Sequence, residues 1–149
     1  MTRYVLDTNL FIEAARDRRK AEELKVFSSA FLPFLQFHSV VAQELLAGAI
    51  TARWRRELVE AVIGPYARRG RVVVPSFAAW TRSGEIVAEL VESKALPAGG
   101  VARSFANDAL IAASCREEGL MLVTRNRRDL ELIARVEAVR WTEPWPGRR

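Results

Sequence analysis

Tyr4-Val5-Leu6-Asp7-Thr8-Asn9 is the stretch of sequence that decides the fold. Its first three residues form a continuous apolar run, typical of a strand buried on both faces, and Asp7 stands where that strand would end. Four other short apolar runs are interpreted as strands in the same way. They are Leu35 to Val40, Val72 to Val74, Met121 to Thr124 and Val139 to Trp141.

Helical patterns occupy the segments between these strands. The clearest runs from Ser76 to Ala95, with Ser76 as its N-cap. A second runs from about Ser104 to Glu118, where Gly119 is placed to end it in a left-handed conformation. Thr51 to Arg69 is predicted to be helical as well. Buried strands that alternate with helices predict an α/β fold, a three-layer α/β/α sandwich around a mainly parallel sheet of about five strands.

Size and composition predict one domain that spans residues 1–149, because half of the 149 residues are hydrophobic and a second core would lack material. Leu96 to Gly100 is interpreted as a loop, not as a domain linker. No apolar run reaches the ~20 residues of a membrane span, and too few residues precede Asp7 for a signal peptide. We therefore expect a cytoplasmic protein, in which the single Cys115 is a small core residue.

The net charge of +5 and the pI near 10.1 favour an anionic partner, and nucleic acid is the first candidate. An excess of 20 arginines over 3 lysines is also explained by genomic base composition. Charge alone therefore leaves a nucleic-acid partner and a plain solvated surface equally open.

Acidic residues mark the predicted strand ends. The chain has only four aspartates, and three of them, Asp7, Asp108 and Asp129, stand where an apolar run gives way to a helix or loop. Glu44 lies in the apolar stretch from Val40 to Leu46, where a carboxylate is desolvated unless it finds a cation or hydrogen-bond donors. Ligands of parallel sheets bind at the carboxyl ends of the strands, so all four acids are expected on one edge.

Such a cluster of carboxylates would repel itself unless a divalent ion neutralised it, and oxygen ligands select Mg²⁺ or Mn²⁺ over zinc. Taken singly, each acid also has a structural explanation. Asp7 would cap the next helix, and Asp108 would complement a helix dipole. Glu44 would pair with an arginine such as Arg103. The coincidence of four acids on one edge favours the metal site.

Four blocks of the sequence resemble the motifs of PIN-domain ribonucleases, and the likeness is closest to the VapC-type toxins of bacterial type II toxin–antitoxin systems. The resemblance covers nearly the whole chain, in order and with similar spacing. The blocks are Val5 to Asn9, Ala42 to Ala49, Asn107 to Ala113 and Thr124 to Leu130.

The resemblance implies an acidic active site in which Asp7 and Asp108 are the principal Mg²⁺ ligands. Glu44 maps onto a further acidic position. Some relatives carry their last acid where this chain has Asn126, and others use the later Asp129, so either residue remains a candidate for the fourth position. The number of ions, one or two, also stays open. The implied reaction is metal-assisted hydrolysis of phosphodiester bonds in RNA.

Further expectations follow from the same resemblance. Asn9 and Thr124 match positions that support the acids by hydrogen bonds. The resemblance also implies a cognate antitoxin and a homodimer. Two sets of residues are candidates for the corresponding surfaces. Arg125, Arg127 and Arg128 are candidates for binding the RNA backbone, although a charged turn explains them equally well. The candidates for protein contacts are Trp54, Trp80, Phe27, Phe31 and Phe34, and at least half of these are expected to pack in the core instead.

Other enzyme classes lack their signatures. The only histidine, His38, lies in a predicted strand, which excludes cleavage by a pair of histidines and argues against a serine or cysteine triad. No GxxxxGK[ST] loop is present. A non-catalytic module remains as the alternative, either a basic α/β nucleic-acid binder or a receiver-like domain. A receiver needs a lysine near the last strands, and the last lysine of this chain is Lys94.

Overall fold

The computed structural model describes residues 1–147, which form two compact units. Unit 1 comprises Met1–Val74 together with Gly147, and unit 2 comprises Pro75–Pro146. Each unit is described by itself below. The expectation of one domain over residues 1–149 stays a prediction.

The strands of unit 1 are parallel. They are β1 (Tyr4–Leu6), β2 (Leu35–His38) and β3 (Val72–Val73), in the order β3-β2-β1. In the register, Tyr4 is opposite Leu35 and Phe37 is opposite Val72. Because the strands run the same way, the residues that follow β1 and β2 emerge at the same edge of this sheet.

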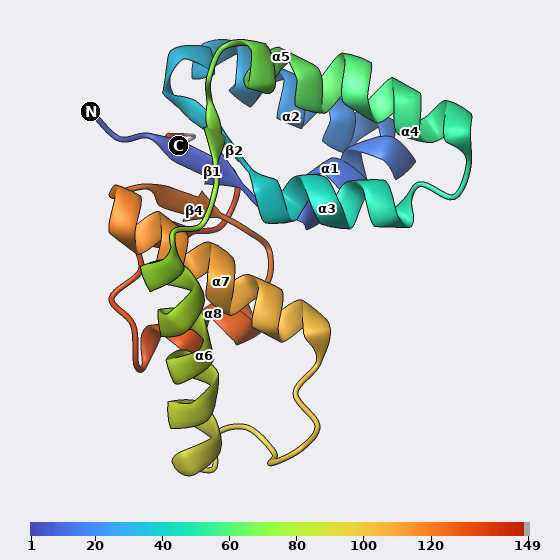
Figure 1. Cartoon of the computed structure of the whole chain (residues 1–149). Helices are drawn as coiled ribbons and strands as arrows, with labels where there is room; N and C mark the ends of the chain where they lie inside the picture. The colour runs from blue at the N-terminus through green and yellow to red at the C-terminus, as the bar shows by residue number, and fades with distance from the viewer. Residues whose placement is uncertain (148–149) are drawn as a thin grey trace. The chain divides into compact units, whose positions relative to one another are not determined.

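Helices connect these strands in unit 1 (Figure 1). They are α1 (Thr8–Arg16), α2 (Arg18–Ala30), the 3₁₀ turn η1 (Leu32–Phe34), α3 (Ser39–Gly48), α4 (Ala52–Leu58), the π-helical turn η2 (Val59–Ile63) and α5 (Gly64–Arg68). The predicted helix from Thr51 to Arg69 is confirmed as helical, with Thr51 as the N-cap of α4. A π turn interrupts it before Pro65, whose ring supplies no N–H to the helical hydrogen-bond series.

Strand β2 ends two residues earlier than predicted. His38 Nδ1 accepts a hydrogen bond from the Val40 N–H at 3.1 Å, so the imidazole caps α3 and residues 39 and 40 already belong to the helix. The strand predicted from Val139 to Trp141 is also displaced toward the C-terminus. Strand β5 is Trp141–Thr142, because the backbone hydrogen bonds to the neighbouring strand begin at the Arg140 carbonyl.

Unit 2 contains the remaining elements, α6 (Phe77–Glu92), α7 (Arg103–Glu118), β4 (Met121–Val123), α8 (Arg127–Ala134) and β5. Helices α6 and α7 pack against each other (Figure 1). The predicted N-cap of α6 and C-cap of α7 are confirmed, because the Ser76 hydroxyl accepts from the Ala79 N–H at 3.0 Å and Gly119 has a φ of 66°. The C-terminal end of α6 was predicted wrongly, since the helix ends at Glu92 and not at Ala95. Strands β4 and β5 are parallel, with Leu122 opposite Trp141.

An α/β fold with five strands is therefore confirmed, and every strand pairing within the two units is parallel. Leu96 to Gly100 lies outside the helices and strands, and Cys115 is a buried free cysteine, both as predicted. Within residues 1–147, no helix has the length and apolar character that a membrane span requires.

Aromatic packing corrects one surface prediction. Phe27 is a core residue of unit 1, where its ring stacks on Phe31 with centroids 4.7 Å apart and meets Tyr4 edge to face at 5.6 Å. Trp54 and Trp80, by contrast, are 41% and 58% exposed. Of the five aromatic residues predicted as contact candidates, only Trp54 and Trp80 are exposed in the described chain.

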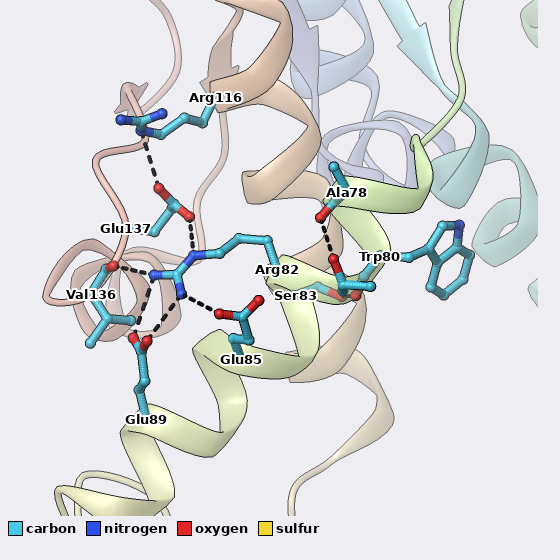
Figure 2. Close-up of polar contacts among 10 residues, drawn as sticks. Ala78, Trp80, Arg82, Ser83, Glu85, Glu89, Arg116, Val136 and Glu137 are labelled. Atoms are coloured by element: carbon cyan, nitrogen blue, oxygen red, sulfur yellow. Dashed lines mark hydrogen bonds and ion pairs between the residues drawn. The ribbon is translucent and has the colours of Figure 1, made fainter.

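A network of ion pairs organises unit 2 around Arg82 of α6 (Figure 2). Its guanidinium donates to Glu137 at 2.6 Å, to Glu89 at 3.0 Å and to the Val136 carbonyl at 2.6 Å. Glu137 is bonded in turn to Arg116 of α7 at 3.1 Å. The hydrogen bonds to Glu89 and Glu137 raise the pKa of Arg82, which stays charged. The network therefore connects α6, α7 and the segment that follows α8.

Candidate functional site

Asp7 lies at the junction of β1 and α1, where the chain leaves the sheet of unit 1. Its Oδ1 accepts a hydrogen bond from the Thr8 N–H at 2.8 Å, so the carboxylate caps α1. The side chain is only 4% exposed. The helix-cap explanation is therefore correct for Asp7, and the same geometry fixes a buried carboxylate at the end of a parallel strand.

Glu44 is held beside α1 by a residue that the sequence did not single out. The hydroxyl of Thr8 donates to Glu44 Oε1 at 2.7 Å. Because α3 begins directly after β2, Glu44 falls within its second turn, and α3 packs against α1. Glu44 is half-buried, so its desolvation is less complete than the surrounding apolar sequence predicts. Thr8 therefore connects the two acids of unit 1.

Asn9 also belongs to this end of unit 1. Its Oδ1 is buried and has no hydrogen-bond partner within residues 1–147. A buried amide oxygen that accepts no hydrogen bond is costly unless a ligand or water satisfies it. This observation is consistent with the supporting role expected for Asn9.

In unit 2, Asn126 connects the two remaining acids. Asp108 lies on α7 and is 7% exposed, and Asp129 lies in the first turn of α8. The amide nitrogen of Asn126 donates to Asp108 Oδ2 at 2.8 Å and to Asp129 Oδ2 at 2.9 Å. The Asn126 N–H donates to the Thr124 hydroxyl at 3.0 Å, so Thr124 orients Asn126.

These bonds separate the roles of the two candidates for the fourth position. Asn126 points its donor group at two carboxylates and holds them together, whereas Asp129 brings a carboxylate to the cluster. Asp108, Asn126 and Asp129 are called the unit 2 cluster below, and Asp7, Thr8 and Glu44 the unit 1 cluster. The sequence signal for the missed Thr8 was its place directly between Asp7 and Asn9.

The donor chemistry of both clusters fits a hard divalent cation. Every candidate ligand is an oxygen, which suits Mg²⁺ or Mn²⁺ and not a soft metal. Within residues 1–147, however, no group of three or more His, Cys, Asp or Glu side chains is close enough to hold a metal by itself. Each cluster supplies two carboxylates. The prediction that all four serve one ion therefore stays a prediction.

The arginines near the unit 2 cluster differ in their surroundings. Arg127 is bonded to Glu131 at 2.8 Å and lies 3.7 Å from Glu143. The hydrogen bond to Glu131, followed by the charges of both glutamates, raises the pKa of Arg127. Arg125 and Arg128 are exposed. Because Arg127 is engaged by two carboxylates, the exposed Arg128 is a better candidate than Arg127 for contacts with phosphate.

His38 is a packed residue, as predicted, and its chemistry is structural. It is fully buried, and burial lowers its pKa to about 4. The neutral ring accepts from the Val40 N–H through Nδ1, while Nε2 is buried with no partner in the described chain. His38 therefore positions α3, the helix that carries Glu44.

Comparisons with known proteins were made for the whole chain. The family model of the PIN domain matches residues 4–136. No curated protein matches the chain at the threshold of significance.

Several solved structures share the fold. DNA-bound VapBC from Salmonella typhimurium superposes with a TM-score of 0.69 and 24% identity, over 96% of this chain and 98% of that one. FitAcB from Neisseria gonorrhoeae superposes with a TM-score of 0.67 and 22% identity, over 96% of this chain and 99% of that one. VapBC-5 from Mycobacterium tuberculosis is a member of the VapBC family of toxin–antitoxin systems. It superposes with a TM-score of 0.60 and 19% identity, over 96% of this chain and 99% of that one.

Proposed function

The chain belongs to the PIN-domain family, and from that membership we propose that it is a divalent-metal-dependent endoribonuclease that acts as the toxin of a toxin–antitoxin pair. The observation that carries this proposal is the pairing of acids within each unit. Thr8 holds Asp7 and Glu44 together, and Asn126 holds Asp108 and Asp129 together. Four acids that are widely separated in the sequence are thus oriented by neutral donors.

In the proposed reaction, Asp7 and Asp108 hold Mg²⁺ or Mn²⁺, which when bound supplies an acidified water and neutralises the scissile phosphate. Glu44 and Asp129 would position the attacking water or a second ion. Thr8 and Asn126 fix the orientation of these carboxylates, because a ligand that is itself hydrogen-bonded loses less freedom on binding.

RNA is the proposed substrate. The net charge of +5 favours a polyanion, and Arg125 and Arg128 are exposed near the unit 2 cluster. We place this activity in the cytoplasm, where RNA is available as a substrate.

A cognate antitoxin and a second copy of the chain are the proposed protein partners. The support is that the structural relatives include VapBC from Salmonella typhimurium and VapBC-5, a member of the VapBC family of toxin–antitoxin systems. Exposed Trp80 offers a surface for such contacts. Size-exclusion chromatography with light scattering tests the dimer, and the mass of one chain would contradict it.

Incubation of the purified protein with structured RNA, with and without Mg²⁺, tests the proposed function. We expect cleavage only with the metal, and loss of cleavage in Asp7→Asn and in Asp108→Asn. Asp17→Asn is the matched control, because Asp17 is an exposed cap of α2 and asparagine caps equally well. Retention of RNA without cutting would favour the non-catalytic binder.

Calorimetric titration with Mn²⁺ tests whether the two clusters bind the same ion. If they do, Asp7→Asn and Asp108→Asn each weaken one binding event, and the double variant is little worse than the weaker single variant. Two independent losses that add in the double variant would show that the clusters bind separate ions.

A further inference from the structure

A cavity of about 190 Å³ lies between α1, α3 and α4 in unit 1. Phe11 and Arg16 line it from α1, Glu44 and Gly48 from α3, and Trp54 from α4. The cavity is therefore formed within one unit, and Glu44 belongs both to its wall and to the unit 1 cluster.

The aromatic residues give this cavity a flat apolar wall. Trp54 is 41% exposed, and no aromatic ring of residues 1–147 packs against it. Phe11 is held in place by an edge-to-face contact with Phe37, whose centroid is 5.5 Å away. A fixed phenylalanine and a tryptophan with an accessible ring are the components of a stacking site.

Charge on the rim favours an anionic ligand with an apolar part. Arg16 is exposed and lines the cavity beside the two aromatic residues. Helix α4, which carries Trp54, also contains the exposed Arg56, whereas Arg53 is bonded to Glu57 and Arg55 to the Ala49 carbonyl. A nucleotide combines a flat ring for Trp54 with a phosphate for the guanidinium groups.

The volume of the cavity limits the size of the ligand that it can bind. Sites for drug-sized ligands measure about 300–1,000 Å³, so a cavity of 190 Å³ admits a single ring system and not a whole nucleotide. Resting on the proposed function, we propose that this cavity is a base pocket, which receives one unpaired nucleobase of the RNA substrate beside Glu44. The base stacks on Trp54, and Arg16 binds an adjoining phosphate.

This pocket makes the cleavage position in single-stranded RNA depend on one unpaired base. Bases in a duplex are already stacked, whereas those of loops are free to be inserted between aromatic residues. Because Glu44 lines the pocket, an inserted base sets which phosphodiester lies next to the acids. Cleavage would then occur at a fixed spacing from one unpaired nucleotide.

RNA binding without cleavage tests the pocket directly. In an Asp108→Asn background, the affinity for a fluorescein-labelled single-stranded RNA is measured by anisotropy. We expect Trp54→Ala to weaken binding about fivefold or more, and Trp54→Phe to retain most of it. Phe77→Ala is the matched control, since Phe77 is an exposed aromatic residue of α6 in unit 2, and the affinity of this variant for RNA should be unchanged.

RNA that lacks one base distinguishes the loss of stacking from a general structural effect of Trp54→Ala. One abasic position should weaken binding to the parent protein and have no effect on binding to Trp54→Ala, because the stacking partner is then already absent. An equal loss in both proteins would overturn the proposal.

Gly48→Leu blocks the cavity without removing a wall. A Cβ at Gly48 meets nothing within 4 Å, so the new side chain extends into open space. Gly84→Leu is the matched control, because Gly84 lies in α6 with the same free space. We expect only Gly48→Leu to weaken RNA binding about fivefold or more. Unchanged RNA affinity with weaker antitoxin binding would assign the cavity to a protein segment and overturn the base pocket.

The proposed nuclease activity and the proposed base pocket are contradicted by different results. Metal-dependent cleavage by the wild-type protein decides the proposed function and does not depend on Trp54. If cleavage occurs while Trp54→Ala and Gly48→Leu bind RNA normally, the nuclease stands and the base pocket falls. If the Asp108→Asn protein binds RNA through Trp54 while the wild type does not cleave it, the pocket stands and the nuclease falls.

Discussion

Thr8 donates its hydroxyl hydrogen to Glu44 across 2.7 Å, although 36 residues separate the two in the sequence. The same residue donates its backbone N–H to Asp7, so one threonine orients two acids. Thr8→Val keeps the shape and removes the hydroxyl. We expect RNA cleavage to fall about 10- to 100-fold, which is typical for loss of a residue that orients a metal-site ligand.

Thr8→Ser is the control for this variant, because serine keeps the hydroxyl. It should restore most of the cleavage rate, and circular dichroism should show the same helix content in both proteins. Equal rates for Thr8→Val and the wild type would show that Glu44 needs no orientation by Thr8.

Asn126 is the second residue that orients two acids. Replacing its amide donor by a carboxylate tests this role. Asn126→Asp places a third carboxylate between Asp108 and Asp129, where the amide nitrogen now makes two hydrogen bonds. Repulsion should lower the melting temperature in the absence of metal, and Mg²⁺ should raise it more than in the wild type. Thermal unfolding with EDTA or with MgCl₂ measures both effects.

Asn126→Ala serves as the comparison. It also loses the two hydrogen bonds, but it adds no charge, so its melting temperature should not gain extra sensitivity to Mg²⁺. If both variants respond to Mg²⁺ in the same way, the unit 2 cluster does not bind the ion.

The first strand and the acid at its end could be predicted from sequence because both depend on local patterns. Strand β1 is Tyr4–Leu6 as predicted, and Asp7 directly follows it. The helix caps at Ser76 and Gly119 could also be predicted, since each depends on the chemistry of one residue. His38 was placed in a strand correctly, but its use as the cap of α3 was not predicted because histidine is an unusual N-cap.

Partners that are distant in sequence could not be predicted in the same way. No periodicity indicates that Thr8 bonds to Glu44, or that Asn126 bonds to both Asp108 and Asp129. The sequence predicted an exposed Trp54, but the cavity beside it depends on how three helices pack and could not be predicted. Tertiary packing decides these features.

His38 should make the stability of the protein depend on pH. Burial lowers its pKa from 6.5 to about 4 in the folded state, so between these values the unfolded chain binds more protons. The free energy of unfolding should therefore fall as the pH drops from 6.5 toward 4, by up to about 3 kcal/mol from this residue. Above pH 6.5 this contribution is constant.

His38→Asn isolates the effect, because asparagine can accept the hydrogen bond of the Val40 N–H and does not titrate. Urea unfolding across pH 4 to 7 should show a shallower decline for this variant than for the wild type. Parallel curves would mean that His38 does not titrate differently in the folded and unfolded chains.

Two helical glycines should respond to alanine in opposite directions. A Cβ at Gly64 would lie 2.6 Å from the Val59 carbonyl oxygen of the π turn, so the backbone has to shift. We expect Gly64→Ala to lower the free energy of unfolding by about 1–3 kcal/mol. Gly84→Ala meets nothing within 4 Å and should raise it by about 0.5–1 kcal/mol. Denaturant unfolding compares them, and a stabilising Gly64→Ala would contradict the π geometry.

Arg82 should contribute more to stability than an ordinary surface arginine. Its side chain is 28% exposed, and its partner Glu137 only 10%, so Arg82→Met takes one of two arginine donors from a largely buried carboxylate, which keeps Arg116, and removes the donor to the Val136 carbonyl. We expect a loss of about 1–3 kcal/mol in the free energy of unfolding. Arg53→Met is the control, because the Arg53 and Glu57 side chains are 84% and 61% exposed and such pairs contribute about 0.5 kcal/mol or less. Equal losses in the two variants would show that the network around Arg82 adds nothing beyond solvated ion pairs.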